Sequence, residues 1–198
     1  PLARRDRQPR ALRTLIKPGI WGSGLDSLLK SLSRIIVSEG GPFPVEQLEA
    51  EMARLGKALI FDEQLLLDLV ETPYRNKRVF ALLAMLYPGV DVRNDFHEDH
   101  VFPRARFTRP RLIAAGIPAS DVADYQDRFD RLPNLQLLEG SVNVSKQQKL
   151  PADWIRERFV DPQARQMWLA AHDLHDLPEA IEGFADFYDA RRDRLLAR

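Results

Sequence analysis

The chain has 198 residues, of which 44% are hydrophobic and 29% are charged, a composition typical of a globular protein with a buried core. Its 29 Lys and Arg residues balance its 29 Asp and Glu residues, so the overall charge gives no indication of a nucleic-acid partner. The absence of cysteine excludes disulfides, a catalytic thiol and every metal site that needs Cys.

No segment predicts a membrane span or a secretion signal. The longest purely apolar run, residues 79–87, is far too short to cross a bilayer. No signal peptide is recognisable, and we therefore predict a cytoplasmic protein. Because the sequence begins at Pro1 rather than Met, we expect it to be excised from a longer protein.

The first half of the chain predicts four helices. Apolar residues recur at helical spacing over 25–37, and Gly40-Gly41-Pro42 ends that helix. The same reasoning predicts helices over about 44–55, 62–70 and 75–87. The last of these is apolar on all sides from Val79 to Tyr87, so we expect it to be central and buried.

The second half mixes extended and helical segments. Residues 94–102 lack a helical period and predict a short strand or hairpin, and residues 133–138 predict a second extended piece. Helices are expected over 121–131, from Pro151 through Phe159, over 161–171 and over 178–196. We also expect the three Trp residues and the stripe formed by Phe184, Phe187 and Tyr188 to lie in the core. The predicted fold class is therefore mainly α.

One stretch combines residues that could carry chemistry. Asp99 and His100 end the predicted strand and are followed by Pro103. Asn134 then opens the second extended piece, and Asn143 and Lys146 stand three residues apart after it. This order resembles the HNH, or ββα-metal, nuclease motif. The longer sequence DHVFPRARF…LPNLQLLEGSVNVSKQQKLP is similar to the C-terminal nuclease domain of modification-dependent restriction enzymes of the GmrSD and SspE type.

The resemblance implies a helical domain with a small ββα-metal core inserted near residues 94–150. It implies a single nuclease domain over 1–198, with a helical part over 1–90, the core over 91–153 and C-terminal helices over 154–198. In that family an N-terminal ParB-like, nucleotide-hydrolysing domain precedes the nuclease, and this chain contains nothing that resembles it.

The resemblance also implies roles for individual residues. His100 would be the general base that deprotonates water, since an ordinary imidazole is largely neutral at physiological pH. Asn134 would hold the loop that carries this base. Asp99 and Asn143 would bind Mg²⁺ or Mn²⁺, which prefer oxygen ligands. Because Asn143 stands where a classical HNH motif has His, we do not expect a tight zinc site.

His97 has two interpretations. It lies two residues before Asp99, so on a strand both side chains point to one face. It is therefore either an additional metal ligand or substrate contact, or a strand histidine with a packing role.

Local charge favours a phosphate-binding surface around the motif. Residues 101–118 contain four Arg and no acid, and residues 141–149 contain two Lys and no acid. We expect Arg104, Arg106, Lys146 and Lys149 to contact DNA phosphates, although a solvated charged face would show the same pattern.

A second cluster, His172, His175 and Asp176, gives an alternative. Spacing of three would place both His on one helix face, which could form a metal site of HD phosphohydrolase type with Asp186 or Asp189 as a further ligand. An exposed pair near a helix end is the structural alternative.

The favoured interpretation is a metal-dependent DNA endonuclease or nickase, the effector part of a modification-dependent restriction or antiviral defence enzyme. An inactive DNA-binding module is the alternative from another class, and the HD phosphohydrolase is the third hypothesis.

Overall fold

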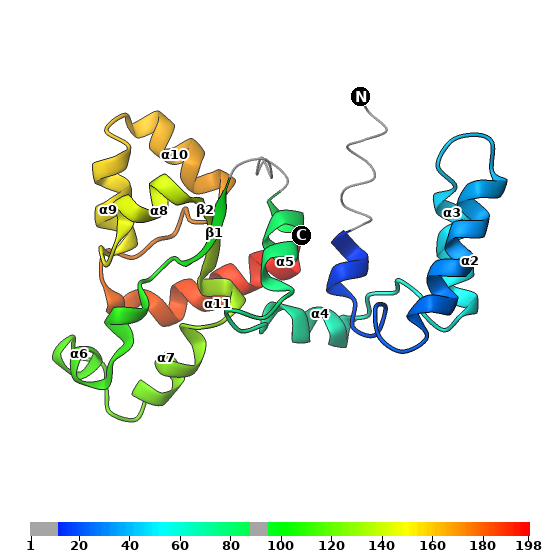
Figure 1. The fold of residues 1–198 in the computed structure, drawn as a ribbon. Helices are drawn as coiled ribbons and strands as arrows, with labels where there is room; N and C mark the ends of the chain where they lie inside the picture. Colours follow the sequence, from blue (N-terminus) through cyan, green and yellow to red (C-terminus); the bar gives the residue numbers. More distant parts are fainter. Residues whose placement is uncertain (1–11, 88–94) are drawn as a thin grey trace. The chain divides into compact units, whose positions relative to one another are not determined.

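The computed structural model describes residues 12–87 and 95–198, and it confirms a mainly helical chain with one small sheet (Figure 1). The chain divides into two compact units, one up to Leu65 and one from Leu66. The expectation of a single nuclease domain with internal boundaries near residues 90 and 153 stays a prediction. Within the described residues, no helix is both long enough and apolar enough to cross a membrane.

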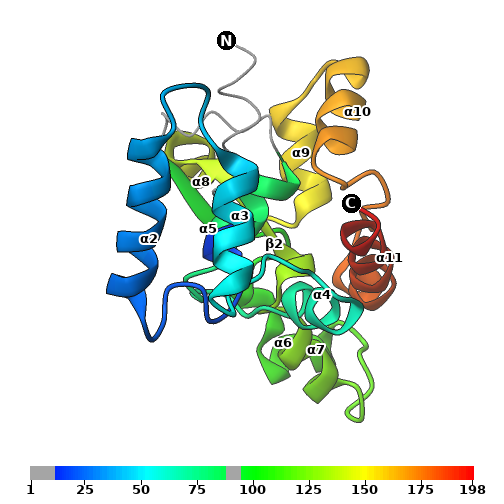
Figure 2. The same cartoon turned by 90° about the vertical axis from the view of Figure 1, so that its right-hand side faces the viewer.

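The first unit is built around a pair of helices that lie side by side (Figure 2). After a short helical segment at 12–16 come α2 (Leu25–Ser38) and α3 (Val45–Arg54). Their small core contains Ile20, Leu28 and Met52. Both helices match the predicted ranges to within a residue or two, because Gly and Pro residues interrupt the helical spacing between them.

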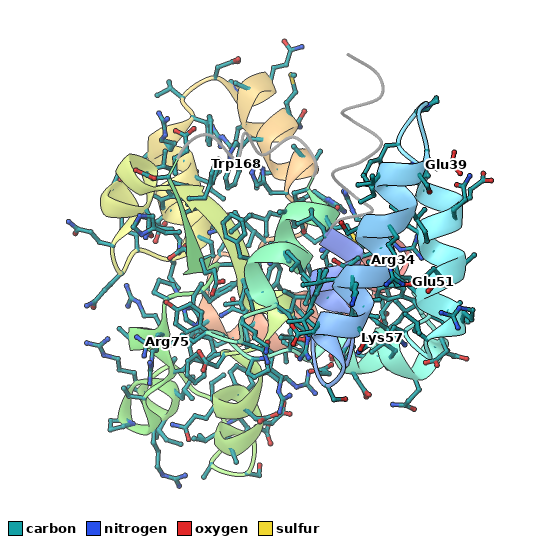
Figure 3. All side chains as sticks on the ribbon, turned by 45° about the vertical axis from the view of Figure 1, so that its right-hand side comes forward. Arg34, Glu39, Glu51, Lys57, Arg75 and Trp168 are labelled. Carbon is teal, nitrogen blue, oxygen red and sulfur yellow. The ribbon has the colours of Figure 1, made fainter. Side chains whose placement is uncertain are left out.

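Polar contacts reinforce this helix pair. Ser31 of α2 donates a hydrogen bond to Glu51 of α3, and the Lys57 ammonium donates to the carbonyl oxygens of Gly19 and Ile20 at 2.9 and 3.0 Å (Glu51 and Lys57 are labelled in Figure 3). The segment before α2 is thereby fastened to the segment after α3.

Helix α4 (Glu63–Val70) contains the boundary between the units, and the second unit holds the remaining elements. Its helices are α5 (Val79–Leu86), α6 (Arg109–Ala114), α7 (Val122–Arg128), α8 (Gly140–Lys146), α9 (Pro151–Arg158), α10 (Pro162–Ala171) and α11 (Phe184–Leu196). Its strands are β1 (Phe96–His100) and β2 (Leu135–Glu139), and three short 3-10 helices are η1 (Arg104–Phe107), η2 (Leu132–Asn134) and η3 (Ile181–Gly183).

The two strands form an antiparallel pair that leads directly into a helix. Asp99 lies opposite Gln136, and His100 lies opposite Leu135. Helix α8 begins at the residue after β2, so the chain order is strand, strand, helix. Figure 1 shows α8 and α9 on one side of this pair and α5 on the other. Both predicted extended segments are therefore confirmed as strands; Asn94, at the edge of the first, lies outside the described residues.

The main core of the second unit is aromatic. Phe102, Phe107, Phe184 and Phe187 pack with ring centroids 4.7–5.4 Å apart. Helix α11 contributes Phe184, Phe187 and Tyr188 to this core, all at most 2% exposed, as predicted.

The three Trp residues differ in burial. Trp154 is buried, whereas Trp168 is half-buried and Trp21 is 43% exposed. The expectation that all three lie in the core therefore holds for Trp154 and fails for Trp21.

Three helices depart from their predicted ranges, and the first of them, α7, ends at Arg128 rather than at residue 131. Helix α5 is shorter than the predicted 75–87. Val79 and residues 81–84 are buried, the last two residues of the helix are half-buried, and Phe80 is 38% exposed. The helix predicted from Pro178 begins only at Phe184. There the chain folds back so closely that a side-chain carbon added at Gly183 would lie 2.5 Å from Pro178, and this turn precludes a continuous helix.

Candidate active site

Asp99 and His100 are neighbours in the sequence, yet their side chains lie on opposite faces of β1, because successive strand residues alternate. The Asp99 face is covered by α8, whereas the His100 face meets residues that precede α5 and follow α7. The motif therefore forms two distinct environments.

His100 is oriented by a carboxylate that the sequence analysis missed. Its Nε2 lies 2.8 Å from Oδ1 of Asp130, just after α7. An ionised carboxylate only accepts hydrogen bonds, so Nε2 carries the proton and Nδ1 is left as the basic nitrogen. The rings of Tyr74 and Phe129 pack on the imidazole, with centroids 4.5 and 5.9 Å away.

Burial keeps this imidazole neutral. The His100 residue is only 8% exposed. Desolvation lowers the pKa of His100 below its ordinary value of 6.5, and the opposing effect of Asp130 is smaller. A neutral imidazole held by a carboxylate has the properties of a general base.

Asn134 is fully buried just before β2, and its side chain bonds the segments that follow β1 and α7. Its Oδ1 accepts from the Phe102 backbone N–H at 2.9 Å, and its Nδ2 donates to the carbonyls of Phe102 and Phe129 at 3.2 and 2.7 Å. These three bonds hold the segment after His100 and the residue before Asp130. This placement agrees with a role in positioning the base rather than in contacting substrate.

Asp99 is held by two donors on the other face. Its Oδ2 accepts from the Lys146 ammonium at 2.7 Å and from Gln136 Nε2 at 3.0 Å. Lys146 also donates to the carbonyl oxygen of His100. The end of α8 is thereby fastened to the end of β1.

Lys146 does not lie where a phosphate could contact it. The residue is 1% exposed, and burial lowers the pKa of its ammonium while Asp99 opposes that shift. The predicted phosphate contact for Lys146 is therefore not met in this structure, because α8 turns this side chain toward the strands instead of the solvent.

The two other proposed ligands, His97 and Asn143, lie on β1 and on α8. His97 is exposed, and its Nε2 would lie 3.1 Å from a side-chain carbon added at Gly140, so its ring rests against the start of α8. Both interpretations of His97 stay predictions. Asn143 is half-buried on α8, one turn before Lys146.

The residues on this face supply oxygen atoms of the kind that Mg²⁺ and Mn²⁺ bind. Asp99 keeps Oδ1 outside its two hydrogen bonds, and Oε1 of the adjoining Gln136 is buried without a hydrogen-bond partner. Asn143 adds an amide oxygen on α8.

Oxygen donors of this type suit a hard cation whose shell is completed by water and phosphate oxygens. The described residues hold no group of three or more His, Asp or Glu that could bind a metal without such help. The Lys146 ammonium beside Asp99 weakens cation binding by charge repulsion.

The predicted phosphate-binding residues differ in availability. Arg104 is exposed, and its guanidinium lies 6.0 Å from the centroid of Phe129, a ring that also packs on His100. Arg106 donates to the Gln148 carbonyl at 3.1 and 3.2 Å, and Lys149 pairs with Glu157.

The His172 cluster is not assembled as predicted. Helix α10 ends at Ala171, so His172 and His175 do not share a helix face. His172 packs on Trp168 with ring centroids 4.2 Å apart, whereas His175 is exposed beside Asp176. Asp176 in turn pairs with Arg194 at 2.7 Å. The expectation of one helix face is wrong because the helix ends too early.

Sequence reasoning missed Asp130, Gln136 and Tyr74. Asp130 is 30 residues from His100, and no spacing rule connects them. Gln136 carries a signal in hindsight, since it is a polar residue within an otherwise apolar strand, and such a residue is usually buried only with a partner.

Comparisons with known proteins add no identification. The chain matches no protein-family model, and no curated protein is significantly similar to it. The resemblance to the nuclease family therefore stays a prediction made from the residues quoted above.

Proposed function

We propose that this chain is an endonuclease domain that hydrolyses DNA phosphodiester bonds with His100 as the general base. The observation that carries the proposal is the buried His100 imidazole at the end of β1, held by Asp130 at 2.8 Å. The order β1, β2, α8 supports it, since the ββα-metal core has this order.

Each residue has a definite task in this proposal. Nδ1 of His100 takes a proton from the attacking water, and Asp130 stabilises the imidazolium that forms. Asn134 keeps the strand end in place. Arg104 and Arg106 hold the DNA backbone. When bound at Asp99 and Asn143, Mg²⁺ or Mn²⁺ would stabilise the charge of the phosphate and of the leaving oxygen.

The biological setting follows from the resemblance alone. We infer a nickase within a modification-dependent restriction or antiviral defence enzyme, acting in the cytoplasm and joined to a ParB-like nucleotide-hydrolysing domain. The isolated chain should cut DNA regardless of modification, because its basic residues are suited to phosphates rather than to base edges.

One observation favours the alternative of an inactive DNA-binding module. The Lys146 ammonium already neutralises Asp99, the first proposed metal ligand. If this pair persists when DNA binds, the domain could hold DNA without cutting it.

A plasmid-nicking assay with Mg²⁺ or Mn²⁺ tests both functions. We expect nicking by the wild type and a loss of about 10²–10⁴-fold in His100→Ala. His175→Ala is the matched control, because this exposed histidine lies outside the site. DNA binding without nicking by the wild type would favour the inactive module, and wild-type nicking by His100→Ala would refute the site.

A further inference from the structure

A cavity of about 490 Å³ lies within the second unit, at the end of the β1–β2 strand pair that is farther from His100. It is bordered by the end of β2 and by residues of α8, α9 and α10. Its volume is in the range of small-molecule sites. Five aromatic side chains line it: Tyr87, Phe96, Trp154, Phe159 and Trp168.

The aromatic side chains form an ordered wall. Trp168, labelled in Figure 3, is the centre of this wall. Its ring centroid lies 4.2 Å from His172, 5.4 Å from Phe159 and 5.6 Å from Trp154. Walls of this kind bind planar rings, and nucleobases stack on aromatic side chains whatever their sequence.

The rim of the cavity carries an available positive charge. Arg158 is exposed and lies 5.6 Å from the Phe159 ring centroid, and it makes no ion pair with a described residue. Arg198 also lines the cavity but is bound to Asp173. Glu139 is the one acid among the described lining residues. The guanidinium of Arg158 is therefore suited to a phosphate.

A second arginine lies behind the wall, fully buried. Arg191 donates to the Pro133 carbonyl at 2.7 Å, the Tyr87 hydroxyl at 3.2 Å and the His172 carbonyl at 3.4 Å, and its Nε has no partner. None of these acceptors carries a charge, and burying an uncompensated charge is costly.

Tyr87 connects this buried charge to the cavity. Its hydroxyl oxygen accepts from Arg191, so its own O–H remains as a donor. Through space, Arg191 lowers the pKa of His172 and Asp173 raises it, and burial adds to the lowering. A positive charge at the rim and another behind the wall favour a ligand that is both planar and anionic.

We propose that this cavity binds one nucleotide unit, with the base against the Trp168 wall and the phosphate at Arg158. The unit is either a free nucleoside monophosphate or one unpaired nucleotide of a DNA strand. The second source rests on the proposed nuclease function. Phe96, beside the cavity, and His100 are four strand residues apart, which is about 13 Å, so one bound strand could reach both places.

Tryptophan fluorescence can test the proposal directly. Two of the three Trp residues line the cavity, so a bound base should quench emission excited at wavelengths that the base does not absorb. The probes are deoxyadenosine monophosphate, deoxyadenosine without phosphate, and DNA duplexes with or without a one-nucleotide bulge. EDTA is present, so binding is measured without cleavage.

We expect saturable quenching by deoxyadenosine monophosphate and weaker binding of deoxyadenosine. Arg158→Ala should bind the monophosphate roughly tenfold more weakly, the effect of losing one hydrogen bond to a charged group. Arg156→Ala is the matched control, since Arg156 lies on the same helix but pairs with Asp153 and Glu179. Tyr87→Phe should also weaken binding while keeping the ring.

The probes distinguish the two sources and separate this proposal from the nuclease function. Stronger quenching by the bulged duplex than by the paired duplex assigns the cavity to an unpaired nucleotide, and quenching by the monophosphate alone assigns it to a free nucleotide. His100→Ala should quench like the wild type even if no variant cuts DNA. Absence of quenching by every probe, or equal affinity in wild type and Arg158→Ala, overturns the proposal.

Discussion

Two adjacent residues of β1, Asp99 and His100, lie on opposite faces of the strand in different environments. On one face, His100 is held by the Asp130 carboxylate and packed against aromatic rings, and burial lowers its pKa despite that carboxylate. On the other face, Asp99 forms a buried ion pair with Lys146 and a hydrogen bond to Gln136.

The Asp-His pair is therefore not one chemical unit. The His100 face has the features of a proton acceptor, whereas the Asp99 face already has a positive charge in place. Mutations on the two faces should therefore have different consequences. Those on the Asp99 face should change stability most, and those on the His100 face should change activity most.

The largest effect is expected from breaking the buried ion pair. Lys146→Met should lower the free energy of unfolding by up to about 3–5 kcal/mol, because it leaves the Asp99 carboxylate, whose side chain is only 16% exposed, without its partner. Urea denaturation measures this change.

The matched control is Lys149→Met, which removes a half-exposed lysine paired with Glu157 and should cost less than about 1 kcal/mol. Adding Asp99→Leu to Lys146→Met should recover part of the stability, since no unpaired charge then remains. Equal losses at Lys146 and Lys149 would show that the ion pair does not stabilise the Asp99 face.

The next effect concerns the His100 face. Asp130→Asn should reduce nicking by roughly 10- to 100-fold, since the imidazolium loses its carboxylate. Asp130 raises the pKa of His100, so its loss should also move the acid limb of the pH–rate profile to lower pH. Asp127→Asn, which affects a carboxylate that pairs with Arg131, should leave the profile unchanged. A profile that does not move would remove Asp130 from the site.

The basic residues near the two faces provide a finer comparison. Arg104 lies beside Phe129 on the His100 face, whereas Lys149 is occupied by Glu157. Arg104→Gln should therefore reduce the slope of log affinity against log salt by about 0.9, and Lys149→Gln should reduce it less. Anisotropy titrations with duplex DNA at several salt concentrations measure both slopes. Identical slopes for the two variants would contradict a DNA path over the His100 face.

The smallest effect is a pH dependence of stability. Burial lowers the pKa of His100 and of His172 below 6.5 in the folded state. The unfolded chain therefore binds more protons below pH 6.5, and stability should fall as pH decreases from there toward the folded-state pKa values. Thermal melts between pH 7.5 and 5 should show a shallower dependence in His100→Gln than in the wild type. An unchanged slope would mean that the His100 face does not keep its imidazole neutral.

Local pattern determined much of the secondary structure. Helices α2, α3, α4 and α10 lie within a residue or two of their predicted ranges, because apolar spacing and Gly or Pro stops act within one helix. Both strands were also predictable. Helix α6 was missed, since its six residues are too few to show a period.

The arrangement of the site depended on tertiary structure. The order of Asp99, His100, Asn134 and Asn143 could be read from the sequence, and strand alternation places the first two on opposite faces. Which elements cover each face depends on the tertiary packing. The sequence predicts that Lys146 contacts a DNA phosphate. In the structure α8 docks on the strands and buries Lys146 against Asp99, which lies 47 residues earlier in the sequence.

The order of the residue types, and most of the elements that carry them, follow from the amino-acid sequence. The partners of these residues depend on tertiary packing, because the partner of a buried charge is set by whichever element packs against it. Asp130 reaches His100 across 30 residues through the turn after α7, and Lys146 reaches Asp99 through α8. Desolvation acts on those final contacts, so the neutral state of His100 is a property of the packed molecule and not of its motif.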